Sequence, residues 1–255
     1  MCSNDFRLEN CLKIKKAFAT KNYHKKEKKL EELDLICMWI AELVPLSATL
    51  FSFIYGLRKF FKKGKPLFLQ SITMAMGCHA LGSIYHLCQT LTTETVLEGF
   101  TPAYLGRIGF FLFFIAASYG QMDRIVDDGS AQIRPSRYVA LIAPVLAGLL
   151  FLPNAFMDDL PIETKISALL VWLPAMVSVY YNLKHAIIPN CDFGFIKAIK
   201  PYNVLAVCLG FAELCCLTAW DYLYSAPLVI TSVIFAVVCV TLMLVAKKGA
   251  EKWTI

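Results

Sequence analysis

Residues 226–246 read APLVITSVIFAVVCVTLMLVA and contain no Asp, Glu, Lys, Arg or His. At about 1.5 Å of rise per residue, a helix of this length crosses the ~30 Å hydrocarbon core of a lipid bilayer. Surface helices of soluble proteins keep one polar face toward water, and this stretch has none. It therefore predicts a membrane-spanning helix.

Six further apolar runs of similar length precede it. Hydrophobic residues make up 58% of the chain and charged residues 17%, and the charges fall almost entirely in short intervals between the runs. We therefore predict an all-α, polytopic transmembrane bundle of seven helices, with no second domain. The predicted spans are 35–56, 67–91, 103–123, 137–156, 164–184, 202–223 and 226–246.

The short connection between the last two runs predicts an antiparallel helical hairpin. Pro45, Pro144 and Pro174 lie inside runs. They are tolerated in bilayers because neighbouring helices satisfy the backbone groups that proline leaves unpaired. The domain prediction is a basic N-terminal tail (1–33), a transmembrane domain (34–247) and a short cytoplasmic tail (248–255).

Lys and Arg gather in alternate intervals. The first, third and fifth intervals and the C-terminal tail are basic, whereas the second, Thr92–Pro102, has neither residue. Basic loops face the cytoplasm in most membrane proteins. We therefore predict a cytoplasmic C-terminus and an external N-terminus. The short chain and its minimal loops favour a place in the cytoplasmic (plasma) membrane.

The N-terminal tail conflicts with this topology, because residues 1–33 hold nine Lys and Arg. Either the tail is exported with its charge, or the first segment does not fully cross, or a crossing has been missed. We favour export, since the other four cytoplasmic regions agree with one another. A basic, partly helical segment is typical of membrane surfaces, and we expect no nucleic-acid partner.

Ionisable residues within spans are costly in lipid, so they usually face the bundle interior or a water-filled cavity. Glu42 shares a helix face with Thr49 and Ser52, and His79 shares one with His86. We expect the outer half of the membrane to contain Glu42, His86, Arg107 and Asp221, with His79 and Glu213 nearer its middle. Together they would form one broad layer, in which mutual pairing would lower the cost of burial. The candidates for ligand binding or proton relay are Glu42, His79, His86, Arg107, Glu213 and Asp221.

Purely structural interpretations of these residues stay open. Arg107 and Asp221 lie near span ends and could extend to the interface. His86 could hydrogen-bond a neighbouring helix. Glu42 and Glu213 are deeper, with no charged neighbour four residues away on their own helices, which favours a functional interpretation.

A second candidate group lies at the predicted cytoplasmic ends of the third and fifth spans. A carboxylate is unfavourable at a helix C-terminus, so we expect Asp123 to have a cationic partner, either Arg124, Lys184 or a basic residue of an odd-numbered loop. Residues 127–130, Asp-Asp-Gly-Ser, are typical of a turn. The alternative is a contact for a cytoplasmic signalling partner. This group consists of Gln121, Asp123, Arg124 and His185.

The chain has ten cysteines, but their spacing indicates neither a disulfide framework nor a zinc site. Inside apolar runs a thiol behaves as a small hydrophobic group. We expect no metal site and no cofactor. Seven cysteines lie in such runs, namely Cys37, Cys78, Cys88, Cys208, Cys215, Cys216 and Cys239.

The predicted topology resembles that of heptahelical receptors, but the motifs differ. The last span has no Lys at 229–244 for a retinal Schiff base, and Asp123-Arg124 matches only two residues of an Asp-Arg-Tyr motif. Ser83 and His86 are similar to the early Ser and His of transmembrane hydrolases, but the last histidine is His185, so the late His pair is missing. We assign no family.

Three functions are compatible with the sequence. The first is a receptor or sensor with an outward-facing polar cavity for a small molecule or ion. The second is a small-solute or proton-coupled transporter, although no internal repeat is visible. The third is an intramembrane, metal-assisted lipid hydrolase, which needs three converging ligands. We favour the receptor because the loops are compact and carry no catalytic motif.

Overall fold

The computed structural model describes most of the chain after the N-terminal tail. The described residues are 33, 35–62, 65–92, 100–123, 127, 129, 131, 133–156, 161–188, 194–221 and 225–253, with side chains left out at 121, 194–198, 220, 221, 225 and 250–253. They form helices and turns, with no strand among them. The predicted N-terminal tail lies outside this part up to residue 32.

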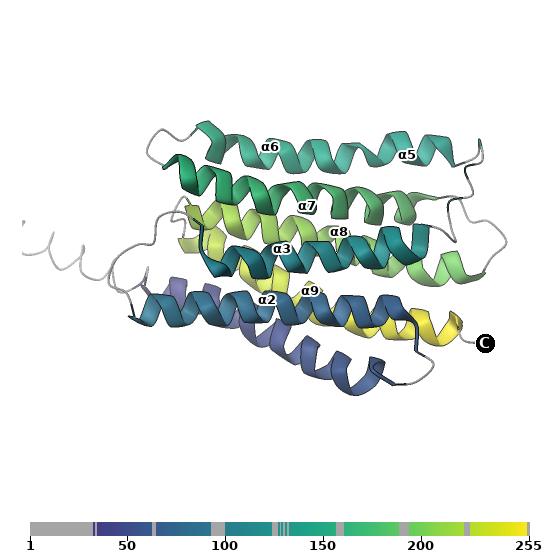
Figure 1. Ribbon diagram of the computed structural model, residues 1–255, viewed down its shortest axis with the longest axis horizontal. Helices are drawn as coiled ribbons and strands as arrows, with labels where there is room; N and C mark the ends of the chain where they lie inside the picture. The colour runs from purple at the N-terminus through teal and green to yellow at the C-terminus, as the bar shows by residue number, and fades with distance from the viewer. Residues whose placement is uncertain are drawn as a thin grey trace, which may run out of the picture.

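Within the described residues, seven helical segments are long and apolar enough to cross a membrane, which confirms the predicted number of spans. The helices lie side by side along the long axis of the molecule (Figure 1). They are the first helix Leu35–Phe60, α2 Leu67–Thr92, α3 Pro102–Ile115, the π-helical η1 Ala116–Asp123, α5 Arg134–Ala140, α6 Ile142–Phe156, α7 Ile162–Ile187, α8 Gly194–Asp221 and α9 Ser225–Trp253.

The helices α2 and α8 are the most buried spans, whereas the first helix and α5–α6 are the least buried. Figure 1 accordingly places α5 and α6 along one edge of the bundle and the first helix obliquely along the other. Large aliphatic side chains such as Leu81, Val145 and Val237 are more than half exposed. An apolar surface of this kind is suited to lipid rather than to water.

Proline divides the fourth span into two helices. α5 ends at Ala140 and α6 begins at Ile142, on the two sides of Leu141. These positions are four and two residues before Pro144. Because proline has no N–H and its ring collides with the carbonyl four residues earlier, it disrupts the helix at Ala140. In the fifth span Pro174 lies inside an unbroken α7.

The helices α2 and α3 cross in backbone contact. A Cβ atom built on Gly106 would lie 2.6 Å from both the carbonyl oxygen of Cys78 and the Cα of Gly82. Small residues of this kind let membrane helices approach closely and pack. The crossing also sets the position of Arg107, the next residue on α3.

We expect Gly106→Ala to destabilise the protein by about 1–3 kcal/mol, because the two backbones must separate to accept the new methyl group. The control is Gly148→Ala, whose Cβ would meet only the flexible end of Met176 at 3.1 Å. Thermal unfolding in detergent compares the two variants. Equal stability of both would contradict the close crossing.

Candidate functional site

A buried carboxylate joins three helices at the centre of the bundle. The carboxylate belongs to Glu213 of α8. Its Oε2 lies 3.1 Å from Nε2 of His79 on α2, and its Oε1 lies 3.1 Å from Nε of Arg107 on α3. The side chains of His79 and Glu213 are each 4% exposed. Removing a carboxylate from water this completely is costly, and the two partners offset that cost.

Aromatic rings hold His79 in place. The ring of Phe235 stacks on it with centroids 4.8 Å apart, and Phe110 meets it edge-on at 5.2 Å. The hydroxyl of Ser83 lies 3.4 Å from Nδ1. Packed apolar neighbours strengthen the Glu213–His79 interaction, because they keep water and its high dielectric constant away.

A second pair lies beside this triad. Nδ1 of His86 on α2 is 2.7 Å from Oε1 of Glu42 on the first helix. Electrostatic attraction from Glu42, as well as from Glu213, acts on the Arg107 guanidinium. We call the five residues Glu42, His79, His86, Arg107 and Glu213 the Glu213 cluster.

Exposure divides the Glu213 cluster into a closed and an accessible part. His79 and Glu213 form the closed part, whereas Arg107, His86 and Glu42 are 25%, 24% and 12% exposed. Glu213 contacts the guanidinium through Nε, and the guanidinium has further donors on its two terminal nitrogens. The accessible part therefore combines a fork of donors with a neighbouring carboxylate.

A second cluster of charges lies at the other end of the third span. Arg137 of α5 makes two hydrogen bonds to the carboxylate of Asp127, one of them 2.9 Å long from Nε to Oδ2. Nζ of Lys184 on α7 lies 3.0 Å from the same carboxylate and also pairs with Asp123. His185 Nε2 lies 2.9 Å from Asp123 Oδ1. We call these five residues the Asp127 cluster.

The Asp127 cluster rests on a π-helical segment. Asp123 ends η1, and within η1 the Ser118 hydroxyl donates a 3.0 Å hydrogen bond to Asn182 of α7. Asn182 in turn donates to the carbonyl of Ser178. π-Helical turns are rare and occur frequently at functional sites. Here the segment directs Asp123 toward Lys184 and His185.

The two aspartates of this cluster are held ionised. Burial raises the pKa of Asp123, but hydrogen bonds from His185 and Lys184 outweigh it, so the pKa lies below the ordinary value of 3.8. The hydrogen bonds from Arg137 lower the pKa of Asp127 well below 3.8, and Lys184 adds to the effect. Gly129, with φ of 80°, donates its N–H to Asp127 Oδ1 and closes the local turn.

This arrangement predicts a defined pH dependence. A carboxyl whose pKa is lowered by folding stabilises the folded state above its unfolded pKa, and that contribution is lost as the pH falls through the lower folded value. We therefore expect Asp127→Asn to reduce the Tm at pH 7, and the difference from the wild type to shrink only below 3.8. Thermal unfolding at a series of pH values measures this. A difference already closing above pH 5 would contradict it.

Not every predicted site residue is described. The side chains of Asp221 and Gln121 and the whole of Arg124 lie outside the described residues. The structure brings together five of the six candidates for the predicted polar layer and two of the four in the second group, Asp123 and His185.

Sequence reasoning left Asp127 and Arg137 out of the second group and included Lys184 only as a candidate partner of Asp123. Asp127 was interpreted as part of a turn, and it does accept the turn's N–H from Gly129. The sequence signal that could have found the pairing is Lys184 itself, a cation in the last turn of an apolar helix. In the structure only 3% of its side chain is exposed. Such a residue requires a partner.

Among the described residues, no group of three or more His, Cys, Asp and Glu side chains could hold a metal ion. The seven cysteines of the apolar runs are free thiols.

Comparison with known proteins leaves the function to be argued from these two clusters. No family model, curated protein or solved structure matches this chain. The geometry of the charged side chains is therefore the basis for a proposal.

Proposed function

We propose that this protein is a heptahelical receptor or sensor of the plasma membrane, with its N-terminus outside, which binds a small ligand at the accessible part of the Glu213 cluster. The ligand carries a carboxylate or another oxyanion. The observation that supports this most is the partly exposed guanidinium of Arg107, which Glu213 contacts through Nε. A planar fork of donors is suited to bidentate recognition of an oxyanion.

The surrounding charges fit such a ligand. Arg107 is the permanent cation of the cluster. Glu42, beside His86, would attract an amino group if the ligand is zwitterionic.

A route for the signal follows from the third span. Arg107 lies near the start of α3 and Asp123 at the end of η1, and the two segments follow each other without a break. A ligand that draws Arg107 away from Glu213 would shift α3. Helix shifts of about 1–2 Å are a common switching motion, and here they would act on the Asp123 contacts with Lys184 and His185. A cytoplasmic partner would sense that end of the bundle.

The test is ligand-induced thermal stabilisation of the purified protein in lipid nanodiscs, with a panel of acetate, succinate, inorganic phosphate and amino acids. We expect at least one of these anions to raise the Tm saturably. The effect should be strongly reduced in Arg107→Lys, which keeps the charge but loses the fork. Arg58→Gln, which removes an exposed arginine outside the cluster, should respond as the wild type does.

Arg107→Gln/Glu213→Gln, which removes both charges of one pair, is the second variant in case Arg107→Lys is unstable. The proposal is overturned if no anion of the panel stabilises the wild type, or if stabilisation persists in both Arg107 variants.

A carrier that moves a proton or a polar solute is the second candidate. The contacts from Ser83 to His79 and from His79 to Glu213 form a short chain of groups that can exchange protons. Uptake driven by a proton gradient into proteoliposomes, abolished in Glu213→Gln, would favour the carrier over the receptor. Saturable binding without uptake would favour the receptor.

A further inference from the structure

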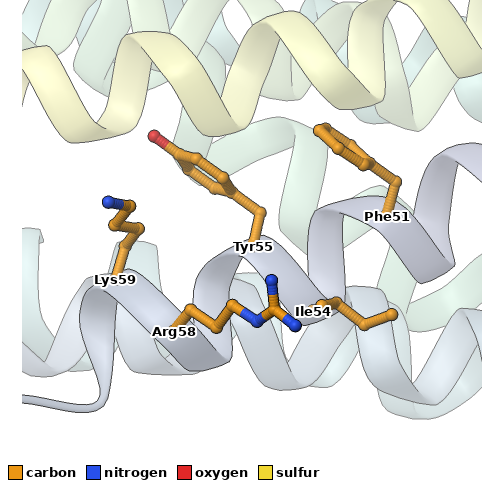
Figure 2. A pocket seen from close by; sticks show the side chains of 5 residues that line it. All are labelled: Phe51, Ile54, Tyr55, Arg58 and Lys59. Atoms are coloured by element: carbon orange, nitrogen blue, oxygen red, sulfur yellow. The ribbon is translucent and has the colours of Figure 1, made fainter.

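A hollow beside the first helix lies apart from both charged clusters. It has a volume of about 380 Å³ and is lined by Phe51, Ile54, Tyr55, Arg58 and Lys59, all from the last turns of that helix. In Figure 2, Phe51 and Tyr55 point toward α9. Lys59 lies where the helix finishes, and the Arg58 side chain extends from there along the helix toward Ile54. We call it the first-helix groove.

The first helix contacts its neighbours along an adjacent face, which leaves this groove open. Ser52 lies 3.4 Å from the Cys239 sulfur of α9, and Gly56 approaches Thr73 of α2. Phe51 and Ile54 are instead exposed, at 55% and 42%. The groove is thus a second feature of the same helix, and no described side chain of another helix lines it.

The groove is apolar at one end and basic at the other. Phe51 and Lys59 are eight residues apart, which corresponds to about 12 Å along the helix axis. This length spans the step from a lipid headgroup to the upper part of its acyl chains. The aromatic and aliphatic side chains suit the chains, and the two cations suit a phosphate.

The charge around the basic end is one-sided. From Glu42 to Glu94 the sequence contains no other Asp or Glu, whereas Arg58 and Lys59 are followed by Lys62 and Lys65. The end of α9 that carries Lys247 and Lys248 lies at the same end of the bundle (Figure 1). An anionic group is therefore the complementary occupant.

We propose that the first-helix groove is a binding site for one anionic phospholipid. Its phosphate contacts Arg58 and Lys59, and its acyl chain lies along Ile54, Tyr55 and Phe51. Clusters of Lys and Arg directly on the cytoplasmic side of a membrane helix bind acidic headgroups, and this is the side that the positive charges indicate. The site is independent of the ligand site at the Glu213 cluster.

The test uses phosphatidylglycerol with a photoactivatable group in its acyl chain, in nanodiscs of fixed composition. Crosslinks to the segment 51–59 are mapped by mass spectrometry. Phosphatidylcholine with the same photoactivatable chain reports ordinary boundary lipid. Each Lys or Arg near the surface contributes about fivefold to binding of an anionic lipid. Arg58→Gln and Lys59→Gln should each reduce the phosphatidylglycerol crosslinks by roughly that factor.

Two further variants separate charge from shape. Ile54→Trp fills the apolar end without changing the charge, and it should also reduce crosslinking. Arg134→Gln removes an exposed arginine from the start of α5, on the opposite edge of the bundle (Figure 1), and should leave crosslinking unchanged. The proposal is overturned if phosphatidylcholine labels the groove as strongly as phosphatidylglycerol, or if Arg134→Gln acts like Arg58→Gln. All substituted positions are exposed, and an unchanged Tm checks that each variant folds.

Discussion

Glu213→Leu is expected to destabilise the bundle by about 3–5 kcal/mol, because it leaves the cation of Arg107 and the imidazole of His79 without their shared carboxylate. The side chains of His79 and Glu213 are each only 4% exposed, so water cannot take the place of the carboxylate beside His79. Reversible unfolding of the protein in bicelles measures the loss.

The double variant Arg107→Met/Glu213→Leu should recover much of the stability, since apolar residues often replace a complete buried ion pair at little cost. Glu163→Gln, at an exposed position in the first turn of α7, is the control and should change stability by less than about 0.5 kcal/mol. If Glu213→Leu is as stable as this control, the carboxylate is not a structural partner of His79 and Arg107.

Lys184→Met should destabilise the protein by about 3 kcal/mol, because it removes a buried cation and leaves its carboxylate partners partly unpaired. Lys184 is 3% exposed and pairs with both Asp123 and Asp127. After its removal the two aspartates keep His185 and Arg137, respectively, but they lose the cation that lies between them. Their mutual repulsion then adds to the cost of burial.

The control for this variant is Lys248→Met, which removes an exposed lysine from the last turns of α9. The same measurement should give a near-wild-type free energy of unfolding for it. Combining Lys184→Met with Asp127→Asn should cost less than the sum of the two single changes, because the pair acts as a unit. Strict additivity would contradict the assigned contact.

The spans were the most predictable feature of this chain, because membrane thickness sets their length and lipid excludes charge from them. Helix ends were predicted less well. The first helix runs to Phe60 rather than 56, and α9 continues to Trp253. Hydropathy marks where apolar side chains stop, whereas backbone hydrogen bonds can continue through Arg58, Lys59 and Lys248.

The change from α3 to the π-helical η1 was not predictable from the sequence. Residues 116–123, AASYGQMD, carry no proline, and no local motif specifies a wider turn. The contact of Ser118 with Asn182 and the pairing of Asp123 with Lys184 come from α7, far away in the sequence. Tertiary contacts of this kind override the local preference for an α-helix.

Pairing among charged residues could be anticipated, but the individual partners could not. The position of each residue along its span placed Glu42, His86 and Arg107 at a similar depth in the membrane. That Glu213 contacts both His79 and Arg107 depends on how α2, α3 and α8 pack. One of the determinants is the close crossing at Gly82 and Gly106, which periodicity alone does not reveal.

The central claim is that charges deep in a lipid-spanning bundle turn toward one another. Dipolar-recoupling NMR on isotope-labelled protein in lipid bilayers tests it directly, with Glu213→Gln to assign the signal. We predict an ionised Glu213 carboxyl carbon in strong dipolar contact with the Arg107 guanidinium nitrogen, as expected from 3.1 Å between Oε1 and Nε. A Glu213 signal that couples to lipid chains and to no Arg107 nitrogen would contradict the account.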